Sequence, residues 1–180
     1  MAKNINAIWI KREIGGIDQS YLFNKNSLVR DSYLAIPDPT QTSTKNFYTG
    51  IAGYLSYSLD SDSILKQVFT VGSPTLPDAD STSPTICDFA VIKEGTNNAQ
   101  ESDYIEVVKL TCGDVVGISP TAIASDASFS AGDFVVINSD GKWDDVPPAG
   151  SYTVVAKYVG TNADGLYIFH LINPIYVSGS

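Results

Sequence analysis

Short apolar runs, separated by polar and turn-forming residues, dominate the second half of the chain. From about residue 86 onward these runs are rich in Val, Ile, Tyr and Phe. Runs of this length and composition are typical of β-strands rather than helices. The predicted strands are 86–92, 104–110, 114–118, 133–138, 152–159 and 166–172.

Two turn signals connect the later strands as hairpins. The stretch 139–142 contains Asp-Gly, a strong hairpin signal, and 162–165 is a second turn of the same composition. The strand 166–172 is apolar at both parities, so we expect both of its faces to be covered. Together these elements predict a mainly β fold, arranged as an antiparallel small barrel or sandwich.

The front of the chain has a different pattern and predicts an extended N-terminal arm. Residues 8–14 alternate like a half-buried strand, and aromatic islands follow at 21–23 and 33–36. A loop rich in Pro and Thr at 37–44 ends the segment. Such islands suit an arm laid along another surface, and an ordinary loop-rich start to the domain is the alternative.

One short helix is predicted at 61–69. Asp60 or Ser61 can cap its free N–H groups, and the apolar residues of the segment fit one face. The Pro-rich stretch 72–85 then indicates a linker or a long surface loop. The expected domains are an extended arm or anchor at 1–45 and a β-rich domain at 46–180, with 72–85 as an optional subdivision.

The distribution of charge along the chain excludes some classes of binding partner. The chain of 180 residues has 11 Lys and Arg against 20 Asp and Glu, a formal net charge of −9. Residues 1–45 hold six basic and four acidic side chains (+2), which leaves five basic and sixteen acidic (−11) for 46–180. The electrostatic footprint of nucleic-acid binding is therefore missing. No apolar run reaches the roughly 18 residues that a membrane span needs, so neither nucleic acid nor membrane is an expected partner.

Residue types that carry catalysis or bind metals are scarce, so we predict no enzyme activity, no cofactor and no metal site. One His (His170) and two Cys (Cys87 and Cys112) cannot supply the usual four-ligand Cys/His zinc site. For His170 a core or interface role in its apolar strand is favoured over a general-base role. The two Cys are expected to be buried free thiols, and a disulfide between them is the alternative.

Two further features have both a structural and a binding interpretation. Trp143 offers a flat apolar face to a sugar or a protein partner, but packing across its hairpin is favoured. Oxygen-bearing side chains crowd the same turn and can wrap Ca²⁺, although the hairpin explains them without a metal. These side chains are Asn138, Asp140, Asp144 and Asp145.

Partner-binding residues are predicted in the mildly basic, aromatic front segment. Buried aromatic residues and Arg supply most of the binding energy at protein interfaces. Trp9 and Arg12 form the leading pair, and the aromatic islands provide the other contacts. The predicted partner-binding residues are Trp9, Arg12, Tyr21, Phe23 and Tyr33.

The C-terminal part of the chain resembles a family of viral proteins. The residues that carry the resemblance are 132–143 (GDFVVINSDGKW), 154–160 (VVAKYVG) and 165–169 (GLYIF). On these residues, 103–172 resembles the β-tulip-like or small-barrel modules of tailed-bacteriophage head decoration (cement) proteins.

The resemblance implies a non-enzymatic structural protein that binds the outer surface of a phage capsid and stabilises it. The implied partners are the major capsid protein and further copies of the chain as a trimer, with a monomer at a local symmetry axis as the alternative. The implied location is the virion surface, after synthesis in the host cytoplasm. The alternative function is a phage tail or carbohydrate-binding β module, which the ten Tyr and two Trp favour.

Overall fold

The protein is built almost entirely of β-strands, which confirms the predicted fold class. A computed structural model describes residues 8–14, 17–23, 32–59, 62, 65–73, 88–94 and 104–178. Within these ranges the only helical element is one turn of 3₁₀ helix, Pro120–Ala122.

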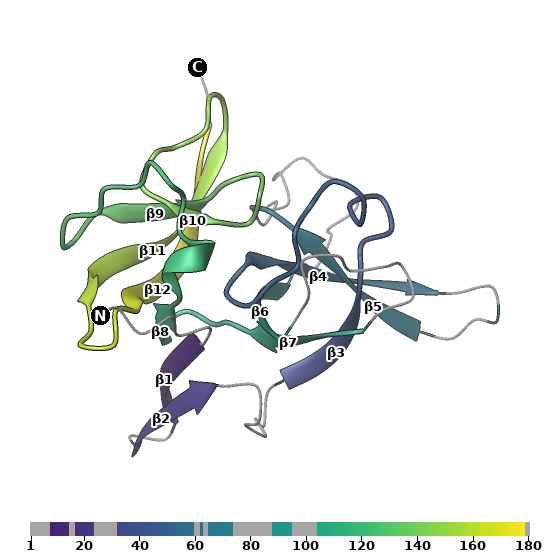
Figure 1. Ribbon diagram of the computed structural model, residues 1–180, viewed down its shortest axis with the longest axis horizontal. Helices are drawn as coiled ribbons and strands as arrows, with labels where there is room; N and C mark the ends of the chain where they lie inside the picture. Colours follow the sequence, from purple (N-terminus) through teal and green to yellow (C-terminus); the bar gives the residue numbers. More distant parts are fainter. Residues whose placement is uncertain are drawn as a thin grey trace.

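The strands form two units that lie side by side (Figure 1). The first is a closed barrel with the order β3-β5-β4-β6-β7. Its strands are β3 (Ser32–Pro37), β4 (Ala52–Leu59), β5 (Leu65–Val71), β6 (Asp88–Glu94) and β7 (Ile105–Lys109). All of its strand pairs are antiparallel except β3 with β5.

The second unit is a seven-stranded antiparallel sheet with the order β10-β9-β11-β12-β8-β1-β2. The N-terminal strands of this sheet are β1 (Ile8–Ile14) and β2 (Ile17–Phe23). The other five are β8 (Val115–Ile118), β9 (Phe134–Ile137), β10 (Trp143–Asp144), β11 (Tyr152–Thr161) and β12 (Tyr167–Val177).

The segment 1–45, predicted as one arm, contributes strands to both units. The β1–β2 hairpin extends the sheet, because β1 pairs with β8 from Ile8↔Ile118 to Lys11↔Val115. β3, by contrast, closes the barrel between β5 and β7. A cut after residue 45 would therefore remove a barrel strand, and the anchoring role of the segment stays a prediction.

The short helix is not at 61–69, where the sequence pattern placed it. Leu65–Val71 form β5, which pairs along its whole length with β4. Phe69 and Val71 are buried while Thr70 between them is partly exposed, the two-residue period of a strand. The local capping signals favoured a helix, but pairing with β4 on one side and β3 on the other satisfies the backbone and closes the barrel.

Both predicted hairpin turns are present and share the pattern Asn-x-Asp-Gly. The side-chain oxygens of Asn138 and Asn162 each accept hydrogen bonds from the backbone N–H groups two and four residues later, at 2.9–3.1 Å. Gly141 and Gly165 follow at φ +73° and +84°, a conformation that side chains with a Cβ rarely adopt. The turn residues thus determine both hairpins locally.

Trp143 joins the barrel to the sheet. Its side chain is fully buried, and its Nε1 donates a 3.0 Å hydrogen bond to the carbonyl oxygen of Gly50, just before β4. The indole stacks on Phe169 of β12, with ring centroids 4.7 Å apart, and lies 6.0 Å from Phe89 of β6. Trp143 is therefore a core residue shared by the two units, and its ring is not accessible to a sugar or a partner.

Candidate functional site

One face of the seven-stranded sheet is open to solvent. Val135 on β9 and Phe169 on β12 are buried, whereas the alternate residues Phe134 and His170 are exposed. Lys157 of β11 is exposed between them, paired with Phe134 on one side and with His170 on the other. Paired residues of neighbouring strands lie on the same side of a sheet, so these three form one row.

The row continues into the N-terminal hairpin. His170's partner on β8 is Val115, which in turn pairs with Lys11 on β1. A neighbouring row runs through Ile168, Gly117 and Trp9. We call this side of the sheet the open face, defined by Trp9, Lys11, Phe134, Lys157, Val159, Ile168 and His170.

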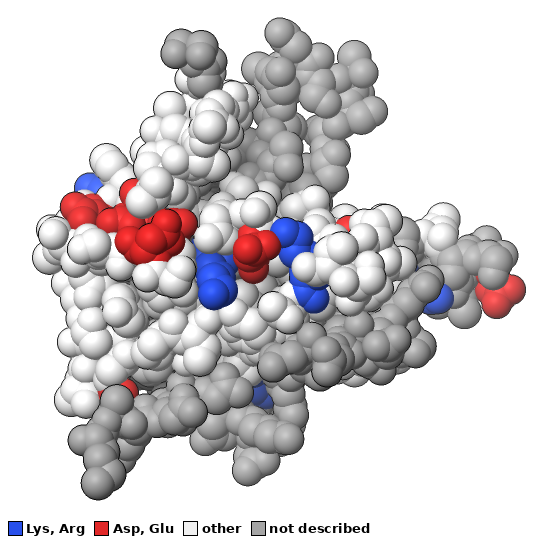
Figure 2. All heavy atoms as spheres, turned by 45° about the horizontal axis from the view of Figure 1, so that its top comes forward, with Lys and Arg blue, Asp and Glu red and all other residues white. Residues whose placement is uncertain are grey.

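Within the two rows that define the open face, the charged residues are basic. Lys157 Nζ lies 5.2 Å from the centre of the Phe134 ring, a cation–π contact. Lys11 is in the same row, and the described residues of both rows include no Asp or Glu. In the view of Figure 2, the acidic side chains of the described residues gather in a few groups. By register, Glu13 of β1 and its partner Asp18 of β2 lie on the same side as Lys11, so the open face combines apolar residues with charges of both signs.

The structure separates the five residues predicted to bind a partner. By register Trp9 is on the open face, while Arg12, three positions later on β1, is on the opposite face. Tyr21 and Phe23 of β2 pair with Ile10 and Ile8 of β1, which lie on the same face of the sheet as Arg12. Tyr33 belongs to the barrel and packs against its core. For the other four the structure describes the backbone and not the side chains, so their binding role stays a prediction.

His170 is exposed, and the expectation that both faces of 166–172 are covered is wrong. Phe169 and Leu171 are buried, but Ile168 and Ile172 beside His170 are only half-buried. Apolar residues at both parities therefore marked a strand with one buried face and one apolar open face. The sequence signal for the exposed face was Lys157, a charged residue within the otherwise apolar strand β11, which pairs with His170.

The oxygen-bearing side chains of the first hairpin turn do not converge on a common point. Asp140 forms an ion pair with Lys45 at 2.7 Å, and Asp145 accepts hydrogen bonds from the backbone N–H of Ser128. Asp144 is buried and accepts hydrogen bonds from Asn138 Nδ2 at 3.3 Å and from the backbone N–H of Val146 at 3.0 Å. Across the described part of the chain, no three His, Cys, Asp or Glu side chains gather as a metal would require.

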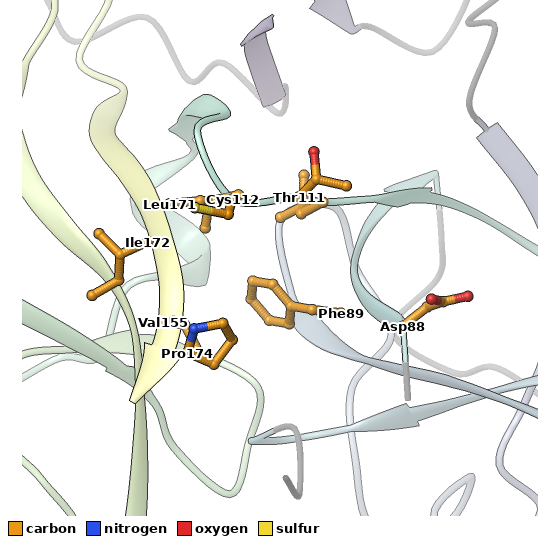
Figure 3. Close-up of a pocket in the computed structure, with 9 residues that line it drawn as sticks. Asp88, Phe89, Thr111, Cys112, Val155, Leu171, Ile172 and Pro174 are labelled. Carbon is orange, nitrogen blue, oxygen red and sulfur yellow. The ribbon is translucent and has the colours of Figure 1, made fainter. Parts of the chain in front are cut away.

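A pocket of about 200 Å³ opens where the barrel meets the sheet (Figure 3). Phe89 of β6 points into it, with Leu171 and Pro174 of β12 on the opposite wall. Cys112 lines the pocket and is exposed, so the expected burial of this thiol is wrong. Cys87 lies outside the described residues. Six of the nine lining residues are apolar, and the ionisable residues among the nine are Asp88 and Cys112.

A polar cluster occupies one end of the barrel. Lys109 Nζ donates hydrogen bonds to Asp88 Oδ2 and, at 3.0 Å, to the hydroxyl of Tyr57. It also lies 4.8 Å from the centre of the Tyr33 ring. Burial opposes the charge on Lys109, but the hydrogen bonds to Asp88 and Tyr57 outweigh it and raise the pKa of the ammonium above its ordinary value of 10.5.

This raised pKa predicts that Lys109 stabilises the fold up to high pH. A group whose pKa is raised on folding contributes stability that is fully present below its unfolded pKa of about 10.4 and is lost as pH rises through the folded value. Between about pH 10 and pH 12, the urea midpoint of the wild type should fall more steeply than that of Lys109→Met, which lacks the ammonium. Parallel pH profiles for the two proteins would contradict the prediction.

Helices in the described ranges are all too short to cross a membrane. Comparison with protein-family models, with curated proteins and with solved structures finds no match to this chain.

Proposed function

We propose that this protein is a non-enzymatic structural protein that docks on the outer surface of a tailed-phage capsid and stabilises it as a decoration protein. The observation that best supports docking is the open face, which combines exposed Phe134 and Val159 with cationic Lys157. Contiguous apolar patches of this kind on a soluble protein mark interaction surfaces. The capsid as partner follows from the resemblance of residues 103–172 to head decoration proteins.

The part of the open face around Phe134 and Lys157 favours a partner surface that is apolar with acidic groups at its edge. Complementary charge guides two surfaces into register and speeds their association. Lys157 and Lys11 would meet such acidic groups, while Phe134 and Trp9 would supply the aromatic contacts that interfaces favour. The strongly acidic remainder of the chain would face water and keep the protein soluble.

The joint between the units is consistent with a stabilising role. A cement protein must transmit force between neighbouring capsid subunits without bending at an internal linker. Trp143, together with the hydrogen bond from the N–H of Ala52 to the carbonyl of Gly141 at 2.8 Å, ties the barrel to the sheet. Load applied to the open face would therefore pass directly into the barrel.

The proposal is tested by retention on purified, expanded phage heads that lack a decoration protein of their own. We expect the wild type to co-sediment with heads up to a fixed copy number. The double variant Phe134→Ala/Lys157→Glu should bind at least about tenfold more weakly, because it loses an aromatic contact and reverses a charge. Light scattering after heating then reports whether bound protein stabilises the heads.

The matched control makes the same two kinds of change on the barrel. Leu34→Ala/Lys66→Glu also removes one exposed apolar side chain and reverses one charge, and it should bind like the wild type. Absence of wild-type retention would overturn the capsid proposal. Equal loss of binding in both double variants would show that the open face is not the docking surface.

A further inference from the structure

One residue from each of the five barrel strands meets at the same end of the barrel interior. The barrel interior contains a layer of residues, one from each strand, that are at most 1 % exposed: Ala35, Leu55, Phe69, Ala90 and Val107. The residues at the end of the barrel each lie two positions along the strand from one of these. Because side chains alternate along a strand, residues two positions apart point to the same side. The five residues above this buried layer form what we call the barrel mouth: Tyr33, Tyr57, Gln67, Asp88 and Lys109.

The barrel mouth has no net charge. The ion pair of Lys109 with Asp88 places one positive and one negative group side by side, and the hydroxyl of Tyr57 is hydrogen-bonded to both. Lys109 Nζ also lies over the rings of Tyr33 and Tyr57, 4.8 and 5.7 Å from their centres. A cationic ligand would be repelled by Lys109 and an anionic one by Asp88, so the mouth favours a neutral ligand.

Gln67 is the member of the mouth that lacks a partner. Its Oε1 is buried, and among the described residues it is the only buried side-chain nitrogen or oxygen without a hydrogen bond. Gln67 pairs with Tyr57 across β4 and β5, so the two side chains lie on the same side of the barrel wall. A buried acceptor without a donor destabilises the fold, and native proteins normally supply that donor.

We propose that the barrel mouth binds a neutral saccharide. In the complex the Gln67 side chain turns outward, and its Oε1, which is buried in the free protein, accepts a hydrogen bond from a sugar hydroxyl. A second hydroxyl donates to Asp88 Oδ1, because the hydrogen bonds of Asp88 to Lys109 and Tyr57 both use Oδ2. Tyr57 is 44 % exposed and offers its ring to the apolar C–H face of the sugar. This site lies on the barrel, and it is therefore separate from the capsid-docking face on the sheet.

The test is saturation-transfer NMR on the full chain with glucose, galactose, N-acetylglucosamine and their disaccharides. We expect weak binding of at least one of these sugars by the wild type. Gln67→Leu keeps the side-chain volume but removes the acceptor, so it should abolish binding and raise the urea midpoint, because the unsatisfied group is gone. Tyr57→Ala should weaken binding several-fold. Tyr104→Ala removes an exposed tyrosine outside the mouth and should bind like the wild type.

Two results would overturn the saccharide site. The first is no binding of any of these sugars to the wild type, together with a stabilised Gln67→Leu, which would make Gln67 a structural residue only. The second is sugar binding that Gln67→Leu and Tyr57→Ala leave unchanged, which would place the sugar elsewhere. Neither result bears on retention on phage heads, so the saccharide site and the docking function fail independently.

Discussion

Replacing Trp143 by Ala is expected to lower the free energy of unfolding by about 3–5 kcal/mol, the range for loss of a large buried aromatic side chain. The indole is fully buried and stacks on Phe169, so its removal leaves a cavity between the barrel and the sheet. The carbonyl of Gly50 would also lose its hydrogen-bond donor. Because small domains are stable by only about 5–15 kcal/mol, the variant should be close to unfolding at 37 °C.

Trp143→Phe separates the two contributions of this side chain. Phe keeps an aromatic ring against Phe169 but has no N–H for Gly50, so we expect a smaller loss of about 1–3 kcal/mol. Urea unfolding should be followed by circular dichroism and by tyrosine fluorescence, whose transitions should coincide if the two units unfold together. A loss below about 1 kcal/mol in Trp143→Ala would show that the units do not depend on this residue.

Gly141→Ala is expected to destabilise the protein by about 3–5 kcal/mol, from backbone strain together with overpacking. At φ +73° the residue is in a conformation that a Cβ disfavours. The new Cβ would lie 2.5 Å from the carbonyl oxygen of Ala52 and 2.7 Å from side-chain carbons of Ile51 and Val71. The carbonyl is backbone, so the first hairpin would have to move away from the barrel.

Gly165→Ala is the matched control, because the second hairpin has the same Asn-x-Asp-Gly turn. Its φ is +84°, but a Cβ at this position would meet nothing within 4 Å. We therefore expect a loss of only about 1–2 kcal/mol, from backbone strain alone. The difference between the two urea-derived free energies measures the packing of the first hairpin on the barrel. Equal losses would mean that this packing does not stabilise the fold.

Both tests concern the joint between the units, on which the proposed docking depends. The open face belongs to the sheet, whereas the barrel mouth belongs to the barrel. A weakened joint would leave each surface present but mechanically uncoupled from the other. We therefore expect Trp143→Ala to reduce the thermal stabilisation of phage heads more than it reduces retention on them.

The strands and turns of the second half could be predicted from sequence, and the helix at 61–69 could not. Turn chemistry at Asn138 and Asn162 acts within five residues, so it determines each hairpin without help from the rest of the chain. Residues 65–71 carry weak local preferences instead, and pairing with β3 and β4 decides their conformation. Propensity is a weak prior that tertiary pairing overrides in this way.

The candidate sites were less predictable than the fold. Trp9 was identified from its residue type, but its neighbours on the open face come from strands more than a hundred residues later. Tyr33 was identified as part of an N-terminal arm, whereas the structure places it in the barrel mouth beside Lys109. Neither association leaves a local signal, because cross-strand register links positions that are far apart in the chain.

The amino-acid sequence by itself determined a mainly β protein with two Asn-x-Asp-Gly hairpins, few catalytic groups and a charge concentrated after residue 45. These properties depend on composition or on interactions within a few residues. Only the tertiary structure decided that the N-terminal segment is shared between two units, that Trp143 joins them, and that the apolar strand of His170 has an open face. The physical reason is that strand order and burial arise from contacts such as Lys45 with Asp140, 95 residues apart, which no local pattern encodes.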